Sequence, residues 1–354
     1  MIWLTWRQFR AQAAVMSGFL AVLAAVLAVT GYELSNDYSH GIATCKTEEA
    51  CQIFTQNLFE DYKSPFLILT LLVLVLPAVI GLFWGAPLVA RELEAGTHRL
   101  AWNQSVTRTR WLTVKLALVG TASVLAATLG SLMVNWWISP LDKSAADQFV
   151  RMSPLLFDTR GITAVGYAAF AFVLGVTIGM VARRTLVAMT LTMVVFVLLQ
   201  VVMPLFVRPH LLPATTLTTQ ITRDNLDSLM SEGPSGPVRI RTEAPDPKAW
   251  VLTNQTVDPS GKAVESIPFT TFSQFCGPQA EGPPPPEGGA APRRPPGPPQ
   301  ACVDAINKLG YQQRITYHPD SRFWSLQLIE TGVFVALAAG LAGFSFWWLR
   351  RRVS

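Results

Sequence analysis

The chain has little charge. Asp, Glu, Lys and Arg make up only 14% of its 354 residues, whereas half of the residues are apolar. About a quarter of the residues in a typical soluble domain are charged. The composition therefore excludes an ordinary soluble domain of this length and favours an integral membrane protein that contacts the lipid bilayer. We expect no nucleic-acid partner.

The chain also lacks the motifs of catalysis. It contains no G-x-x-x-x-G-K-[ST] phosphate loop and no G-x-S-x-G nucleophile elbow. No two carboxylates fall together within an apolar run, as proton relays usually require. The four histidines, which lack a partner at metal-ligand spacing, are His40, His98, His210 and His318. We expect that the chain is not itself an enzyme and binds no metal and no cofactor.

Six apolar runs reach the length of about 20 residues that crosses roughly 30 Å of hydrocarbon. They are Ala11–Thr30, Phe66–Trp84, Leu116–Ile138, Ile162–Val181, Leu186–Phe206 and Leu326–Trp348. Buried helices of soluble proteins can also be apolar all round, but here the charges are confined to the ends of the runs. Lys115 and Glu330, near the start of the third and sixth runs, are expected to snorkel or to face protein. The expected fold class is an all-α integral membrane protein with six transmembrane helices.

Lys and Arg gather beside alternate connections. They precede the first run, lie between the second and third, form the turn between the fourth and fifth, and close the chain at residues 350–352. The positive-inside rule then places both termini in the cytoplasm of a multi-pass membrane protein. The segment 207–325 becomes a large extracellular loop, and residues 326–354 form the sixth helix with a basic tail. The first run is followed by no persuasive A-x-A site, so we expect a retained anchor rather than a signal peptide.

All four cysteines fall in segments assigned to the outside, which supports this orientation. In an oxidising compartment an even set of cysteines predicts two disulfides. Of the three possible pairings we favour Cys45 with Cys51 and Cys276 with Cys302, because each pair shares a loop. Four unpaired thiols are the alternative.

The segment 207–325 is the only part of the chain long enough for a separate folded unit. Apolar and polar residues alternate near Val238–Ile240 and Trp250–Thr253. Residues 282–299, GPPPPEGGAAPRRPPGPP, are expected to form an extended loop, because Pro lacks a backbone donor and Gly costs entropy.

Two kinds of feature within the apolar runs concern packing. Small residues recur at a spacing of four, which lets helices approach closely within the chain or across a homodimer. These residues are Gly81 and Gly85, Gly175 and Gly179, and Gly332, Ala336 and Gly340. Asn135 and Gln200 are the main polar side chains inside the runs; we expect hydrogen bonds between helices, with a place in a substrate path as the alternative.

Two polar segments lie on the side assigned to the cytoplasm. Residues 1–10 mix aromatic residues with arginines and predict an interfacial elbow helix, with Trp3, Trp6, Arg7 and Arg10 as its marked residues. Residues 85–111 connect the second and third of the helices within 11–206. Ala90–Glu94 continues the second helix, Gly96 permits a turn, and Thr97 caps a short helix that ends at Trp102.

Leu93, Leu100 and Trp102 give this connection an apolar patch, which Arg99, Glu92 and Glu94 surround with charge. Exposed Leu and Trp side chains are unfavourable in so short a polar segment unless they bind in a groove of a partner. The alternative is a loop that buries Trp102 among lipid headgroups.

The stretch FWGAPLVARELEAGTHRLAWNQSVTRTRW, residues 83–111, resembles the permease subunits of type-2 ABC exporters, especially the drug and antibiotic-resistance group. The N-terminal WLTWRQFRAQ is similar to the opening of the same permeases. The resemblance implies a location in the bacterial cell (plasma) membrane, and it implies that both segments rest on a separate ATPase subunit. The residues implied to couple the chain to that ATPase are Arg91, Glu92, Glu94, Gly96, Thr97, His98, Arg99, Leu100 and Trp102.

The resemblance implies a complex of two ABC ATPase subunits, which bind ATP and Mg, with this chain and a second permease chain as a homodimer or a heterodimer. Closure of the ATPases would open a path between the spans by alternating access, exporting a hydrophobic drug, antibiotic, lipid or peptide. The long Pro-rich outer segment departs from the family pattern. The alternative function is a membrane sensor or immunity protein that binds an antibiotic or envelope component without transporting it.

Overall fold

The computed structural model of the chain describes residues 2–97, 107–144, 150–231, 236–268 and 300–352. The chain divides into two compact units. Unit 1 comprises Met1–Leu212 and Arg322–Ser354, and unit 2 comprises Pro213–Ser321. The sequence analysis placed the separate unit at 207–325, a range that also takes in Leu211 and Phe323, whose side chains pack inside unit 1.

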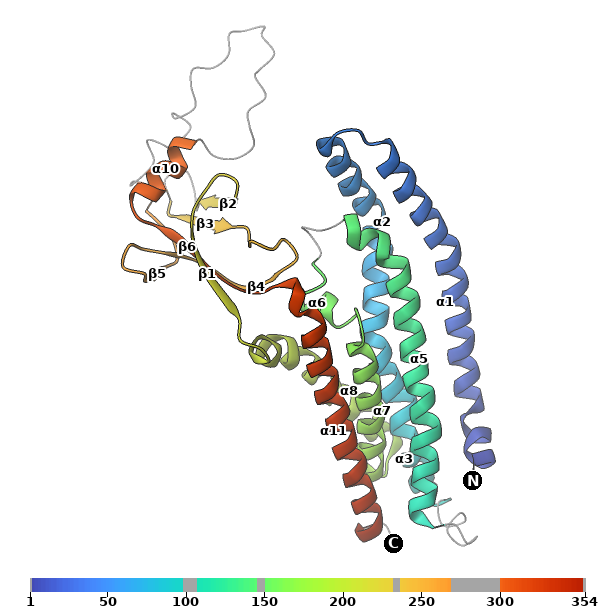
Figure 1. Ribbon diagram of the computed structural model, residues 1–354. Helices are drawn as coiled ribbons and strands as arrows, with labels where there is room; N and C mark the ends of the chain where they lie inside the picture. Colours follow the sequence, from blue (N-terminus) through green and yellow to red (C-terminus); the bar gives the residue numbers. More distant parts are fainter. Residues whose placement is uncertain (1, 98–106, 145–149, 232–235, 269–299, 353–354) are drawn as a thin grey trace. The chain divides into compact units, whose positions relative to one another are not determined.

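Unit 1 is helical (Figure 1). Its long helices are α1 (Ile2–Thr44), α2 (Glu48–Ile80), α5 (Arg108–Ser144), α7 (Thr163–Ala182), α8 (Thr185–Val202) and α11 (Phe323–Arg352). The π-helix η1 (Gly81–Gly85) and α3 (Ala86–Glu94) continue α2, η2 (Met203–Val207) and η3 (Arg208–His210) continue α8, and the short α6 (Pro154–Phe157) precedes α7. In the described part of the chain, six helices are long and apolar enough to cross a membrane, and each contains or overlaps one predicted run. The prediction of a multi-pass helical protein is confirmed.

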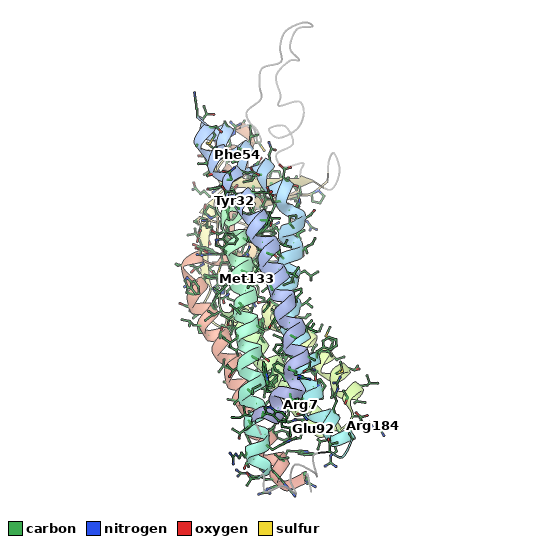
Figure 2. The ribbon with its side chains drawn as sticks, turned by 90° about the vertical axis from the view of Figure 1, so that its right-hand side faces the viewer. Arg7, Tyr32, Phe54, Glu92, Met133 and Arg184 are labelled. Atoms are coloured by element: carbon green, nitrogen blue, oxygen red, sulfur yellow. A yellow bond between two sulfur atoms is a disulfide. The ribbon has the colours of Figure 1, made fainter. Side chains whose placement is uncertain are left out.

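The spans differ in how much of their surface is covered. Protein covers 72% of the apolar window of α7 but only 17% of that of α1. Helix α7 is therefore the central helix of the bundle, and α1 lies at its edge against α5 (Figure 1). Arg7, Glu92 and Arg184 mark one end of the bundle, and Tyr32 and Phe54 mark the other (Figure 2).

Helix α1 departs from the prediction of a separate elbow helix at residues 1–10. One helix runs without interruption over Ile2–Thr44, so Trp3, Trp6, Arg7 and Arg10 lie on its first turns. The physical reason is local: no Gly or Pro occurs between Ile2 and Ser17, so nothing in the sequence interrupts the helical hydrogen bonds.

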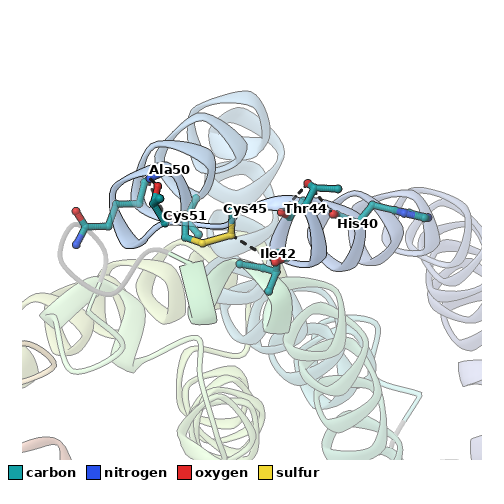
Figure 3. The surroundings of a disulfide bond; sticks show 10 residues. His40, Ile42, Thr44, Cys45, Ala50 and Cys51 are labelled. Carbon is teal, nitrogen blue, oxygen red and sulfur yellow. Dashed lines mark hydrogen bonds between the residues drawn. A yellow bond between two sulfur atoms is a disulfide. The ribbon is translucent and has the colours of Figure 1, made fainter.

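A disulfide joins Cys45 and Cys51 between α1 and α2, with Cα atoms 5.2 Å apart (Figure 3). This predicted pairing is confirmed. Thr47 caps α2, because its Oγ1 accepts from the backbone N of Ala50 at 3.3 Å. Cys302 is also disulfide-bonded, whereas its predicted partner, Cys276, lies outside the described residues, as does the Pro-rich segment 282–299.

Unit 2 contains strands, so the expectation of an all-α chain was wrong. Four antiparallel strands form a sheet in the order β1-β6-β4-β5, namely Thr215–Gln220, Gln312–His318, Trp250–Val257 and Ala263–Val264. Strands β2 (Leu226–Ser231) and β3 (Val238–Thr242) form an antiparallel hairpin, and α10 spans Gln300–Lys308. Along β3, buried and exposed residues alternate, which is the strand period that the sequence already contained at Val238–Ile240. Strands β1 and β4 are rich in β-branched Thr and Val, which favour an extended backbone.

Helix α7 packs directly on the backbone of η1 and α3. A Cβ atom added to Gly175 would lie 2.5 Å from the carbonyl oxygen of Gly81 and 2.6 Å from the nitrogen of Ala86. One added to Gly179 would lie 2.5 Å from the oxygen of Ala86. These small-residue faces pack within the chain. By contrast, nothing lies within 4 Å of a Cβ added at Gly340 on α11.

We predict that Gly175→Ala destabilises the protein, because its methyl group would meet backbone atoms that cannot rotate away. Overpacking of this kind costs about 1–3 kcal/mol. The measurement is thermal unfolding of the purified chain in detergent. Gly340→Ala is the matched control and should unfold at or slightly above the wild-type temperature. Equal unfolding temperatures for wild type and Gly175→Ala would contradict the close packing.

Candidate functional site

The end of the bundle marked by Glu92 contains a cluster of polar side chains from three helices. Glu92, on α3, accepts hydrogen bonds at Oε1 from Gln8 Nε2 on α1 (2.8 Å) and from Lys115 Nζ on α5 (2.6 Å). Its Oε2 accepts from Trp111 Nε1 on α5 at 3.1 Å. We call Gln8, Glu92, Trp111 and Lys115 the Glu92 cluster. One carboxylate thus joins α3 to both α1 and α5.

Lys115 is the buried charge of the Glu92 cluster. Its side chain is 3% exposed, and that of Glu92 is 15% exposed. Besides Glu92, Nζ donates to the carbonyl oxygen of Leu88 at 3.0 Å and lies 4.9 Å from the centre of the Trp111 ring. Because an ammonium group buried without a counter-ion is very unfavourable, this ion pair constrains where α5 lies against α3. Of the two alternatives for Lys115, the structure shows that it faces protein.

Glu94, two residues further along α3, contacts a different helix. Its Oε2 accepts from the backbone N of Thr185 at 2.9 Å and from Thr185 Oγ1 at 2.7 Å. Thr185 is the first residue of α8. A carboxylate at this place satisfies one free N–H group of the first turn and interacts favourably with the helix dipole. Glu94 therefore fixes the start of α8 against the end of α3.

The polar connection after α3 begins as predicted. Helix α3 ends at Glu94, and Gly96 has φ +68°, a left-handed conformation that glycine adopts without strain. At the other end, Thr107 Oγ1 accepts from the N of Arg110 at 3.3 Å, as expected of a residue that caps α5. Arg91 is exposed, and Thr97 is the last described residue before the gap. His98, Arg99, Leu100 and Trp102 lie outside the described residues.

The first turns of α1 present the predicted aromatic and basic residues outward. Trp3 is 68% exposed and Trp6 is 51% exposed. The guanidinium of Arg7 lies 5.3 Å from the centre of the Trp3 ring, and Arg10 is exposed. The opposite side of these turns is anchored by Phe9, whose ring packs edge-on against Trp84 with centroids 4.8 Å apart. The exposed residues thus stand on a segment that is itself fixed to η1.

The two polar residues inside the spans make different bonds. Gln200 Nε2, on α8, donates to the carbonyl oxygen of Leu74 on α2 at 3.3 Å, the expected bond between helices. Asn135 Nδ2 instead donates to Ser131 Oγ at 3.2 Å, within the same helix. The structure therefore does not bring these two residues into a shared contact.

Helices α1 and α2 enclose an apolar groove of about 730 Å³. Val15 and Phe19 line it from α1, and Val75 and Phe83 line it from α2 and η1. Gln12 Nε2 donates to the carbonyl oxygen of Phe83 at 3.0 Å, which satisfies a polar group of the π-helix beside the groove. No group of three or more His, Cys, Asp or Glu residues that could hold a metal ion occurs in the part of the chain that the structure describes.

The sequence analysis missed the partners in the Glu92 cluster. It selected Glu92 as a surface charge beside the apolar patch and noted Lys115 separately, but did not pair them. A signal was present: a lysine at the start of an apolar run is unfavourable unless a carboxylate reaches it. Gln8 and Trp111 carried no comparable signal, because neutral polar side chains are common at helix ends.

A family model described as ABC-2 membrane transporter related matches residues 17–208, more than half of the chain. The matched range contains α2, α3, α5 and α7, and with them Glu92, Glu94 and Lys115. The comparison with curated proteins and that with solved structures each found no match.

We predict that Glu92→Gln lowers the free energy of unfolding by about 3 kcal/mol, because it leaves the buried ammonium group of Lys115 without a counter-ion. The additional change Lys115→Met should recover most of the loss, since it removes the uncompensated charge. Thermal unfolding of the purified single and double variants measures both effects.

Glu60→Gln is the matched control for this prediction. Glu60 pairs with Lys63, but the two side chains are 56% and 40% exposed. Its loss should change stability by less than about 1 kcal/mol. Equal effects of Glu92→Gln and Glu60→Gln would show that the Glu92 cluster contributes no more than a surface ion pair.

Proposed function

The chain belongs to the ABC-2 membrane transporter related family, and from this premise we propose that it is the permease subunit of an ATP-binding cassette exporter in the cell membrane. Membership of the family indicates a transport permease that works with an ATPase partner. The proposal goes further in assigning how the chain is coupled to that partner, how it assembles and what it exports.

The proposed coupling element is the connection 85–111, together with the first turns of α1. The observation that carries the proposal is that α3, which forms the first part of this connection, is bonded to three other helices through two carboxylates. Glu92 joins α3 to α1 and α5, and Glu94 joins it to α8. A force applied beyond Gly96 would therefore act on α1, α5 and α8 together. Arg91, Thr97, His98, Arg99, Leu100 and Trp102 are proposed as the residues in contact with the ATPase.

The proposed assembly contains two ATPase subunits, which bind ATP and Mg, and a second copy of this chain. A row of exposed apolar residues on α1 supports a homodimer. The residues of this row are alternately four and three positions apart, which is the spacing at which two helices pack side by side. Its residues are Val15, Phe19, Val22, Val26 and Val29, which are between 42% and 75% exposed. Both termini are proposed to be cytoplasmic, with unit 2 outside the cell.

The proposed cargo is a hydrophobic drug, antibiotic, lipid or peptide. The apolar groove between α1 and α2 supports this class, because charged or strongly polar cargo would find few partners along it. Asn135 and Gln200 remain candidates for the substrate path. They are half-buried, so each keeps some exposed surface besides its hydrogen bond within the protein.

We predict that a photo-crosslinking amino acid at Trp102 links the full chain, in native membranes, to a soluble polypeptide that contains a G-x-x-x-x-G-K-[ST] loop. Mass spectrometry of the crosslinked band identifies the loop. The matched control is the same amino acid at Gly340, whose neighbourhood is open. A crosslink from Trp102 to lipid alone would contradict the proposal and favour a loop buried among headgroups.

We predict that Gly96→Pro and Glu94→Lys uncouple the complex, because the first distorts the turn after α3 and the second repels the start of α8. In vesicles containing the purified complex, ATP hydrolysis should continue, whereas ATP-dependent uptake of a fluorescent phospholipid and of an apolar fluorescent dye should fall at least tenfold. Glu60→Gln should leave both activities unchanged. Wild-type uptake by both coupling variants would refute the assigned role.

A further inference from the structure

A second polar cluster lies deep in unit 1, at the opposite end of the bundle from Glu92. It consists of Arg208 on η3, Asp158 directly after α6, Tyr167 on α7 and Glu330 on α11. Arg208 and Glu330 are 0% exposed, Tyr167 is 1% exposed and Asp158 is 3% exposed. We call these four residues the Arg208 cluster. The sequence analysis found no two carboxylates together within an apolar run, but folding brings two onto one guanidinium.

Arg208 is the centre of the cluster. Its Nε donates to Glu330 Oε2 at 2.7 Å and its Nη2 to Glu330 Oε1 at 2.8 Å, a two-pronged ion pair. Its Nη1 donates to the carbonyl oxygen of Pro154 at 3.1 Å, and Nη2 also contacts Asp158 Oδ1. The guanidinium carbon lies 4.2 Å from the centre of the Phe157 ring. Glu330 therefore accepts two hydrogen bonds from the guanidinium group, whereas Asp158 accepts one, from the Nη2 that also binds Glu330.

The charges of the cluster do not balance. One guanidinium faces two carboxylates, and Tyr167 is a neutral donor that contacts both Glu330 and Asp158. The nearest other pair, Arg160 with Asp142 at 3.0 Å, is neutral in sum. Of the remaining ionisable groups on the adjoining segments, Arg151 lies over the ring of Phe323 and His210 bonds to the carbonyl oxygen of Phe206. Within the Arg208 cluster itself, one negative charge is therefore left over.

The excess charge falls on Asp158. Oδ1 receives Arg208 and Tyr167, but Asp158 is reached by a single guanidinium nitrogen, Nη2, which it shares with Glu330, whereas Glu330 is held by two. An ionised carboxylate in such a place costs several kcal/mol, and a single added proton removes that cost. We propose that the Asp158 carboxyl group is a proton-binding site, occupied when the Arg208 cluster is packed as described here and emptied as the pH rises.

The surroundings of Asp158 shift the pKa of its carboxyl group upward. Burial raises the pKa of its carboxyl group, Arg208 lowers it, and the negative charge of Glu330 raises it, with a net upward shift. A group whose pKa is higher in the folded than in the unfolded chain stabilises the fold fully at low pH. That contribution is lost as the pH rises through the folded-state pKa.

The site is held in place by α11. Gln327, one turn before Glu330, accepts at Oε1 from the backbone N of Ile162 (3.0 Å) and of Thr163 (2.9 Å), and its Nε2 donates to the carbonyl oxygen of Phe157 at 2.9 Å. These bonds fix the short segment that carries Asp158. Release of the proton would set two carboxylates against one guanidinium and weaken the contact of α6, η3 and α11. The chain leaves unit 1 after Leu212 and returns at Arg322, so proton release loosens both segments that lead to unit 2.

The experiment follows thermal unfolding of the purified full chain between about pH 5 and about pH 9. We expect the wild-type unfolding temperature to fall by roughly 3 °C or more across this range. Asp158→Asn, which keeps the shape of the protonated carboxyl group, should remove most of that fall. Asp142→Asn is the matched control and should retain the wild-type slope, even where its absolute stability is lower.

A second measurement detects the bound proton directly in the wild type, and Asp158→Asn serves only to assign the signal. Infrared difference spectra between low and high pH should contain the carbonyl band of a protonated carboxyl group, shifted in D₂O and absent from Asp158→Asn. The absence of a titrating band in the wild type, or an unchanged pH slope in a folded Asp158→Asn, would overturn the proposal. A stability that depends on sodium at fixed pH would also overturn it, by assigning a metal cation to the excess charge. Neither measurement needs an ATPase or a cargo.

Discussion

A charge buried away from water is stable only beside a partner, and the helices of unit 1 are positioned by that constraint. Lys115 reaches Glu92 on α3, and Arg208 reaches Glu330 on α11. Each pair joins helices that are distant in sequence. Apolar packing between such helices has little preference for one register, because lipid is as apolar as the side chains it would replace. The buried ion pairs therefore fix the positions of the helices along one another, which apolar packing alone does not determine.

The features that depend on neighbouring residues could be predicted from the sequence. The six spans follow from the length of the apolar runs, and the bond between Cys45 and Cys51 follows from their shared loop. The turn at Gly96 is also local, since only glycine adopts its conformation without strain.

The position of Glu94 at the start of α8 could not be predicted, because Thr185 is 91 residues away in the chain.

Features that depend on distant residues escaped prediction for two reasons. Lys115 and Glu330 were recognisable as unfavourable in a span, but nothing local indicates that their partners are Glu92 and Arg208, 23 and 122 residues away. The strands of unit 2 contained a visible alternation at β3, but single strands of five or six residues gain stability only within a sheet. The assembled sheet depends on pairs such as Thr215 with Tyr317, which no local pattern specifies.

The geometry of α3 limits how a force on the connection 85–111 can reach the rest of unit 1. Backbone meets backbone where Gly175 and Gly179 pack on η1 and α3, so α3 has no room to move toward α7. Glu92 and Glu94 are two residues apart and therefore project from α3 about 200° apart around its axis. A rotation of α3 about its axis would pull on α1 and α5 through Glu92 while moving α8 the other way through Glu94. If the ATPase binds the connection 85–111, the motion that these contacts transmit best is a rotation of α3 about its own axis while it stays packed against α7.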